Sequence, residues 1–416
     1  MKATLMTIGL ALGSSAALST AAVAQAPVER VSMSEALQLF GENSLALRIA
    51  RAEASEIEGL ARQSRAYVNP ALAVSREDLG LSGEEYWETV VGLEQRIEWP
   101  GRTAARSRAA GHRVGVAVAG FRADSLRLSF DVRRGYAEAW VAEERERALA
   151  RAAEVIRTVA TAAENRLAEG DISGYETRRL RLERARVEQE MAGAGLDAAA
   201  ARRALGTLVA PQSEAGEIGP SEPLSGLPPS IPEEVALAAL AGRPDLEAAR
   251  RAVEAANAEV SIASTGWVPD PTLFLGFKDR ADGFSGVSVG VTMSMPLFDR
   301  RAGARAGAGA RRDVATAGLT LREREARNDV HAASERYRST RRRLELGGDG
   351  LAAEAAALLE IAESAYGEGE LTLVELLDAA RAFREARVAA VELRADTWIA
   401  YYDLLRALGR APEEDR

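Results

Sequence analysis

Apolar and polar residues alternate along residues 87–99 in the pattern of a β-strand with two unlike faces. One face is mostly apolar and has a tryptophan at each end: Trp87, Thr89, Val91, Leu93, Ile97 and Trp99. The other face is small or charged: Glu88, Gly92, Glu94, Arg96 and Glu98. At roughly 3.4 Å per residue and a tilt of about 45°, a strand of this length spans an apolar band of about 25 Å. The pattern predicts a membrane-spanning strand, and a soluble edge strand is the alternative.

The N-terminus predicts export. Met1 and Lys2 precede an apolar run, and the small-x-small signal Ala22-Val23-Ala24 follows it, so residues 1–24 are predicted to be a signal peptide. No later stretch has the eighteen apolar residues of a membrane helix, which leaves strands for any membrane crossing. The sequence contains no cysteine, so stability must come from packing and assembly instead of disulfides.

The two halves of the chain repeat the same short motifs in the same order, with a period of roughly 200 residues. The motifs at 69–72, 91–93, 169–173 and 204–206 are echoed at 270–273, 289–291, 368–372 and 407–409. This internal repeat predicts three regions after the signal peptide: a first unit at 25–210, a linker rich in Pro, Gly, Ser and Glu at 211–232, and a second unit at 233–416.

Each unit is predicted to contain a helix, two strands and a long helical region that is broken once. Strands are expected at 69–79, 85–99, 271–278 and 284–295, with external turns at 80–84 and 279–283. Residues 101–210 and 297–411 contain no proline and are rich in Ala, Arg, Glu and Leu. Glycines at 170, 174, 367 and 369 mark where each helical region turns back. The arms of the resulting coiled-coil-like hairpins would measure roughly 60 to 100 Å.

On these residues the chain resembles the TolC-like outer-membrane efflux family, over essentially the whole mature sequence. The most specific elements are the two turn motifs at 166–176 and 366–375, each with a glycine, a Ser or Thr and then an acid. The resemblance implies a mixed α+β membrane protein that is a homotrimer. Each protomer would give four transmembrane strands to a shared twelve-stranded barrel, continuous with long periplasmic helical hairpins. Independently, four strands cannot close a barrel, and lipid does not tolerate an open sheet edge.

The resemblance also implies a passive exit duct in the outer membrane, part of a tripartite efflux system, with no catalysis and no cofactor. An inner-membrane pump, of the RND type, would supply the energy. A periplasmic adaptor would grip the tips of the helical hairpins. The residues predicted to contact the adaptor are Glu169, Gly170, Asp171, Ser173, Glu368, Gly369, Glu370 and Thr372.

Acidic residues after the second turn are candidates for an ion-selective entrance. Glu375 and Asp378 lie three apart on a predicted helix, so they share a face, and three copies would surround the periplasmic entrance with carboxylates. A solvated acidic helix face is the alternative. By resemblance, Glu176 and Tyr366 match two positions of a latch that closes the entrance in some family members. Leu371 stands where that latch has an arginine, which puts a salt-bridged latch in doubt.

The barrel interior is predicted to be acidic because Glu88, Glu94 and Glu98 share the polar face of their strand, partly offset by Arg96. Residues 69–72, 77 and 94–102 also resemble the family branch that serves heavy-metal efflux of the cobalt-zinc-cadmium type. The only two histidines, at 112 and 331, are too separated to suggest a cluster of soft ligands. No metal site is therefore predicted, and metals would pass without specific capture.

Other classes of function fit the sequence less well. A net charge of −9 argues against a nucleic-acid partner. The sequence has no phosphate loop, nucleophile elbow or zinc-binding helix motif, so an enzyme is not expected. An exit duct for drugs or for type I protein secretion is the alternative within transport. A periplasmic coiled-coil scaffold or adaptor is the alternative of another class, and membrane fractionation would distinguish it.

Overall fold

A computed structural model describes residues 28–81, 84–169, 173–211, 216–265 and 269–411, so the predicted signal peptide lies outside the described residues. The first half contains β1 (Glu29–Val31), α1 (Met33–Asn43), α2 (Leu45–Arg65), β2 (Ala71–Leu81), β3 (Glu84–Arg96), α3 (Pro100–Glu169) and α4 (Gly174–Val209). The second half contains β4 (Ile218–Pro220), α5 (Glu233–Ala239), η1 (Leu240–Gly242), α6 (Pro244–Thr265), β5 (Thr272–Arg280), β6 (Ser285–Thr292), α7 (Ala302–Arg343), η2 (Leu344–Gly348), α8 (Asp349–Glu368) and α9 (Leu373–Leu408).

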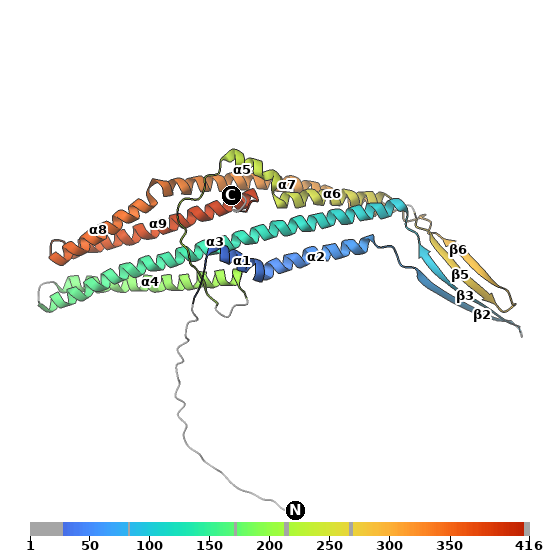
Figure 1. Cartoon of the computed structure of the whole chain (residues 1–416), viewed down its shortest axis with the longest axis horizontal. Coiled ribbons are helices and arrows are strands. Elements are labelled where there is room, and N and C mark those ends of the chain that lie inside the picture. Colours follow the sequence, from blue (N-terminus) through green and yellow to red (C-terminus); the bar gives the residue numbers. More distant parts are fainter. Residues whose placement is uncertain (1–27, 82–83, 170–172, 212–215, 266–268, 412–416) are drawn as a thin grey trace, which may run out of the picture.

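The molecule is elongated, with a β-sheet at one end and helical turns at the other (Figure 1). Near the sheet, helices lie side by side in the order α2, α3, α6, α7; farther away the order is α4, α3, α9, α8. The α3–α4 and α8–α9 turns lie at the same end of the molecule (Figure 1). The helix α3 is therefore an inner helix both near the sheet and near the turns. The helices α2 and α7 are outermost near the sheet, and α4 and α8 are outermost near the turns.

The sheet has the order β2-β3-β5-β6, and all neighbouring strands are antiparallel. Its register brings the apolar residues of the four strands onto one face. The members of this face, all exposed, are Leu72, Val74, Val91, Leu93, Leu273, Leu275, Phe277, Val287, Val289 and Val291. A continuous exposed apolar surface of this kind marks contact with lipid or with another apolar surface.

The predicted strands are present, but their ends differ from the expected ones. The second strand ends at Arg96 instead of residue 99. The reason is that the carbonyl of Trp99 already accepts hydrogen bonds from the N–H groups of Arg102 and Thr103, which starts α3. The fourth strand ends at Thr292 instead of residue 295. Trp99 consequently stands at the corner between strand and helix.

Glycines inside the strands make room for one aromatic ring. A Cβ atom on Gly92 would lie 2.6 Å from the ring of Phe274, and one on Gly276 would meet the same ring at 2.6 Å. Gly290 faces the Cβ atom of Phe274 across the neighbouring strand pair. Gly92 and Gly276 therefore have a packing explanation, because larger residues there would displace Phe274, whereas a Cβ atom on Gly290 would make an ordinary contact.

Helix packing relies on alanine, as the composition suggests. One cluster near the middle of the molecule includes Val132, Tyr136, Trp140 and Leu205, and another near the turns includes Ile156, Leu180, Leu376 and several alanines. Small residues let the helices approach closely. Within the described residues, no helix combines the length and the apolarity needed to cross a membrane.

The second helical region is broken twice, so the prediction of a single break was wrong there. Besides the turn after Glu368, the segment η2 interrupts the helix, and Gly347 adopts a φ of 145° and a ψ of 18°. Only glycine takes such a conformation readily, which explains the break. The first half has an uninterrupted α3 at the corresponding place.

The described part of the predicted linker, residues 216–232, packs against the helices. Its strand β4 pairs with β1 in parallel, and Leu224 is buried. The hydroxyl of Tyr337 lies 2.9 Å from the carbonyl oxygen of Pro228 and 2.8 Å from that of Pro229. The segment thus forms a strap that crosses the middle of the helical layer (Figure 1).

Candidate functional site

The two helical turns begin their second helices with the same hydrogen-bonded cap. The N–H of Ser173 donates to the Glu176 carboxylate at 2.9 Å, and the N–H of Glu176 donates to the Ser173 hydroxyl at 3.3 Å. Thr372 and Glu375 repeat this arrangement at 2.8 and 3.4 Å. These are capping boxes, and the Ser/Thr-x-x-Glu spacing in the sequence is their signature. The predicted gate residue Glu176 and ring residue Glu375 therefore also start helices, a role that the sequence interpretation missed.

The carboxylate of Glu375 is exposed and ionised. A hydrogen bond from the backbone N–H of Thr372 lowers the pKa of Glu375, and the Thr372 hydroxyl lowers it further. Asp378, one turn along α9, is exposed and lies 3.9 Å from Arg381. The two predicted ring residues thus both present carboxylates near the tip. The carboxylate of Glu375 also accepts a hydrogen bond from the N–H of Thr372 at the start of α9.

The tip of the second hairpin is exposed and tightly turned. Gly369 has a φ of 80°, and the N–H of Glu370 donates to the carbonyl of Ala365 at 2.9 Å. Glu368, Glu370 and Thr372 are exposed at this turn. In the first hairpin, Ser173 is exposed, whereas Gly170 and Asp171 lie outside the described residues. Glu169 is the last residue of α3.

The predicted gate residue Tyr366 is half-buried and packs against the cluster of apolar residues near the turns. Leu371 packs against the same cluster, so the position at which an arginine was expected contributes to the core. Tyr366 also lines a cavity of about 280 Å³ between α3 and α8, together with Arg151, Glu154, Val155, Thr158, Val159, Glu363 and Gly367.

A buried ionic cluster joins the sheet to the helices. The side chain of Asp270, just before β5, is only 3% exposed, and it lies 2.7 Å from Arg96 at the end of β3 and 2.6 Å from Arg102 at the start of α3. The N–H of Trp99 donates to the same carboxylate at 3.4 Å, and Arg102 also donates to the carbonyl of Thr265 at 3.2 Å. Residues far apart in the sequence thus hold one corner, which we call the strand–helix joint.

The electrostatics of the strand–helix joint favour an ionised carboxylate. Burial by itself would raise the pKa of Asp270, but the hydrogen bond from Arg96 and the charge of Arg102 outweigh it, and the pKa is lowered overall. Glu98 belongs to the same region: its side chain is 8% exposed, forms an ion pair with Arg106 and accepts a hydrogen bond from Thr103 at 3.1 Å.

The three glutamates predicted to line a barrel interior have different surroundings. Glu88 forms an ion pair with Lys278 on the neighbouring strand and lies 3.9 Å from Arg280. Glu94 is exposed on the same sheet face as Glu88, whereas Glu98 lies beyond the end of β3 in the strand–helix joint. The polar sheet face is consequently less acidic than the sequence interpretation expected.

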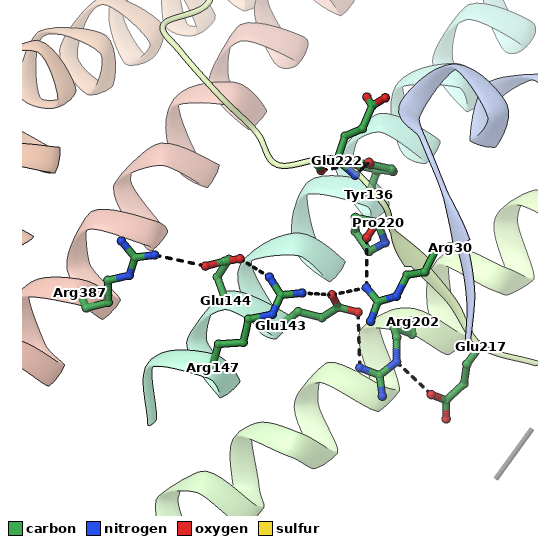
Figure 2. Close-up of polar contacts among 10 residues, drawn as sticks. All are labelled: Arg30, Tyr136, Glu143, Glu144, Arg147, Arg202, Glu217, Pro220, Glu222 and Arg387. Atoms are coloured by element: carbon green, nitrogen blue, oxygen red, sulfur yellow. Dashed lines mark hydrogen bonds and ion pairs between the residues drawn. The ribbon is translucent and has the colours of Figure 1, made fainter. Parts of the chain in front are cut away.

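A second buried ionic network lies at the middle of the molecule (Figure 2). The Glu143 side chain, 5% exposed, is 2.6 Å from Arg30, 3.1 Å from Arg147 and 3.5 Å from Arg202. Arg202 also lies 3.0 Å from Glu217 in the strap, and Glu144 connects the network to Arg387 on α9 at 3.5 Å. The sequence offers only the helical spacings of Arg147 with Glu143 and Glu144 as a signal, because the other partners are remote.

Metal-binding groups do not gather in the part of the chain that the structure describes. Within it, no three or more His, Cys, Asp or Glu side chains are arranged to hold an ion. The Nδ1 atom of His112 lies 3.1 Å from a carboxylate oxygen of Glu254, which makes His112 a partner in a surface polar contact.

Comparisons with known proteins agree with this geometry. Residues 236–410 match the family described as outer membrane efflux protein. The chain is 26% identical, over 387 residues, to the cobalt-zinc-cadmium resistance protein CzcC of Cupriavidus metallidurans, and the match covers 91% of this chain and 90% of that protein.

Solved structures show the same fold. The outer membrane protein VceC of Vibrio cholerae matches with a TM-score of 0.74 at 23% identity, over 91% of this chain and 96% of that chain. The CmeC outer membrane channel of Campylobacter jejuni matches with a TM-score of 0.80 at 18% identity, over 91% and 85%.

An apolar sheet that continues into long helical hairpins is the architecture of an outer-membrane efflux channel, and the resemblance found in the sequence is confirmed. Residues 236–410 thus match the outer membrane efflux protein family, and the chain is similar to CzcC along nearly its full length.

Proposed function

We propose that this channel is the passive exit duct of a system that exports heavy-metal cations. The observation that carries the metal assignment is the match to a cobalt-zinc-cadmium resistance protein along nearly the whole length of both chains. Residues 94–102, which carry the resemblance to the heavy-metal branch in the sequence, form much of the strand–helix joint. The charged groups of Arg96 and Glu98 are paired with Asp270 and Arg106, so their proposed role is to join the strands to the helices. Metals would pass these residues without being captured.

We infer that three protomers share one twelve-stranded barrel. In the described residues, β2 and β6 each pair on one side only, and the sheet exposes an apolar face. Unpaired edges are costly in lipid, and closure through neighbouring protomers satisfies them. The two halves of the chain, residues 25–210 and 233–416, would then be repeats that each contribute two strands and one hairpin to the ring, with the linker at 211–232 as a strap.

The hairpin tips are proposed to face the periplasm and to bind an adaptor. Ser173, Glu368, Gly369, Glu370 and Thr372 are exposed there. The adaptor would connect the duct to an inner-membrane RND pump, which supplies the energy. Its docking would favour an open entrance by binding that state more tightly.

Tyr366 is proposed to help keep the entrance closed, with Glu176 of a neighbouring hairpin as its partner. A hydrogen bond between tyrosine and a carboxylate is worth about 1.5–3 kcal/mol. In Tyr366→Phe, loss of this bond should raise the ion conductance of the purified channel in planar bilayers. Because phenylalanine keeps the packing against the cluster near the turns, folding should not change. Unaltered conductance and gating would remove Tyr366 from the latch.

The metal assignment can be tested in cells. A bacterial host that expresses this chain with its adaptor and pump should tolerate higher concentrations of cobalt, zinc and cadmium than a host that lacks the chain. A matched assay with hydrophobic drugs should show no difference. Increased drug tolerance without metal tolerance would instead support a drug exit duct.

A further inference from the structure

The segment that joins β6 to α7, residues 293–301, is exposed along its whole length. We call it the β6–α7 corner. The segment leaves the helical end of the sheet and continues the apolar row of β6 at every second position. The members of this continued row, all more than half exposed, are Met293, Met295 and Leu297. Phe298 follows them and is 100% exposed. The apolar half of the corner therefore extends the sheet face that would lie in lipid.

Arginines follow directly after the apolar half of the β6–α7 corner. Arg300 and Arg301 are adjacent and exposed, and the exposed Arg305 lies one helical turn into α7. Within the part of the chain that the structure describes, none of these three arginines forms an ion pair. The one acid between residues 293 and 305 is Asp299, which accepts a hydrogen bond from the N–H of Arg301 at 2.7 Å. A chain with a net charge of −9 thus carries a local excess of positive charge beside its apolar sheet.

The strand–helix joint shows what the β6–α7 corner lacks. Arg102 and Arg300 hold equivalent positions, each nine residues after the repeated motif at 91–93 and 289–291. In the joint, Arg102 is neutralised by Asp270, and the repeat places Asn69 at the position of Asp270. Closure of the proposed ring would bring Asn69 of the next protomer beside the end of β6. A neutral amide cannot balance a guanidinium group, so the arginines of the corner would keep their charge unpaired in the ring.

We propose that the β6–α7 corner binds the phosphate of an anionic phospholipid, with Arg300 and Arg301 at the headgroup and with Leu297 and Phe298 among the acyl chains. Guanidinium groups bind phosphate oxygens through pairs of parallel hydrogen bonds. The apolar row directly before the arginines places them where hydrocarbon ends and headgroups begin. This inference rests on the proposed barrel and specifies which lipid the periplasmic rim of that barrel selects.

Native mass spectrometry of the detergent-purified oligomer tests the site. The anionic probe is dioleoyl phosphatidylglycerol, and the zwitterionic probe is dioleoyl phosphatidylcholine. The natural protein should retain phosphatidylglycerol in preference to phosphatidylcholine. Arg300→Gln/Arg301→Gln should bind phosphatidylglycerol about tenfold more weakly, because the loss of one charge-assisted hydrogen bond has an effect of this size. Arg300→Lys/Arg301→Lys keeps the charge and should bind this lipid more tightly than the Gln variant does.

A matched control removes the same charge at the other end of α7. Arg342→Gln/Arg343→Gln replaces two adjacent, exposed arginines roughly 60 Å along the helix from the corner, and it should retain phosphatidylglycerol as the natural protein does. Phe298→Ser should weaken retention, because it removes a side chain that would lie among the acyl chains. For the same reason, an excess of inorganic phosphate should not displace the lipid.

Equal retention of phosphatidylglycerol by the natural protein and by Arg300→Gln/Arg301→Gln would overturn the lipid site. An equal loss in the control variant would overturn it too, since the effect would then follow from overall charge. Displacement of the lipid by inorganic phosphate would replace the lipid site with a site for a free anion. Oligomeric mass and single-channel current are measured on each preparation. Absence of lipid preference in an oligomer that conducts ions would leave the duct intact, whereas a natural protein that is monomeric and never conducts would overturn both.

Discussion

The strand–helix joint and the hairpin turns lie at opposite ends of the helices, and they are stabilised in different ways. The joint depends on the buried carboxylate of Asp270, shared by Arg96 and Arg102 from other elements. The turns depend on exposed capping boxes whose partners are three residues apart. Long-range buried charges hold the joint, whereas local caps begin the second helix of each hairpin. The joint is therefore defined by contacts between distant residues, and the turns by contacts between near neighbours in the sequence.

The largest expected effect comes from breaking the joint. Asp270→Ala would leave Arg102, itself 12% exposed, without its carboxylate. Removing one partner of a buried ion pair typically costs about 3–5 kcal/mol. We therefore expect a marked loss of resistance to denaturant, measured by tryptophan fluorescence of the detergent-purified protein. The control Glu154→Ala removes an exposed partner of Arg157 and should change stability by less than about 1 kcal/mol. Equal losses of stability in Asp270→Ala and Glu154→Ala would show that the buried joint contributes no more than an exposed ion pair.

Acid should weaken the joint. The pKa of Asp270 in the folded protein lies below the usual value of 3.8, so the ionised form is favoured by folding. Its contribution to stability is fully present above pH 3.8 and is lost as the pH falls through the lower folded-state pKa. Unfolding titrations from pH 6 to 2 should show a smaller acid-dependent loss in Asp270→Asn than in the natural protein. Superimposable pH profiles would contradict this role of Asp270.

A smaller, local effect is expected at the turns. Thr372→Ala removes the side-chain acceptor at the start of α9, and the loss of such a cap costs about 1 kcal/mol. Hydrogen exchange should accelerate in the first turn of α9 and stay unchanged at the strand–helix joint. Thr158→Ala is a matched control, because its hydroxyl bonds to the carbonyl of Glu154 within a helix. If exchange at the joint also accelerated, the two ends would not be independent.

The smallest effect on stability is expected at Asp378. Its exposed carboxylate lies 3.9 Å from Arg381, so Asp378→Asn should leave unfolding unchanged. If Asp378 lies in an acidic ring at the entrance, this substitution should weaken blockade by multivalent cations added on the periplasmic side. Asp378 is a cleaner probe than Glu375, which also caps α9. Undiminished blockade in Asp378→Asn would exclude Asp378 from the ring.

Local patterns predicted the elements but not the contacts that join them. Alternation identified the second and fourth strands, the repeated motifs at 69–72 and 270–273 located the other two, and clustered glycines located both hairpin turns. The capping boxes were present in the sequence as Ser-x-x-Glu and Thr-x-x-Glu and were interpreted only as gate or ring positions. The Arg96–Asp270 pair and the Glu143 network could not be predicted, since their partners are separated by 174 and 113 residues. The break at Gly347 has a signal in the sequence, the run Gly347-Gly348-Asp349-Gly350, which the sequence interpretation did not use.

The most direct test of the duct is single-channel recording of the purified protein in planar bilayers, with the molecular mass determined on the same preparation. The account predicts an oligomer that forms a stable pore with a preference for cations, and whose current is blocked by divalent or trivalent cations from one side only. A protein that stays monomeric and never conducts would contradict the account and favour a periplasmic scaffold.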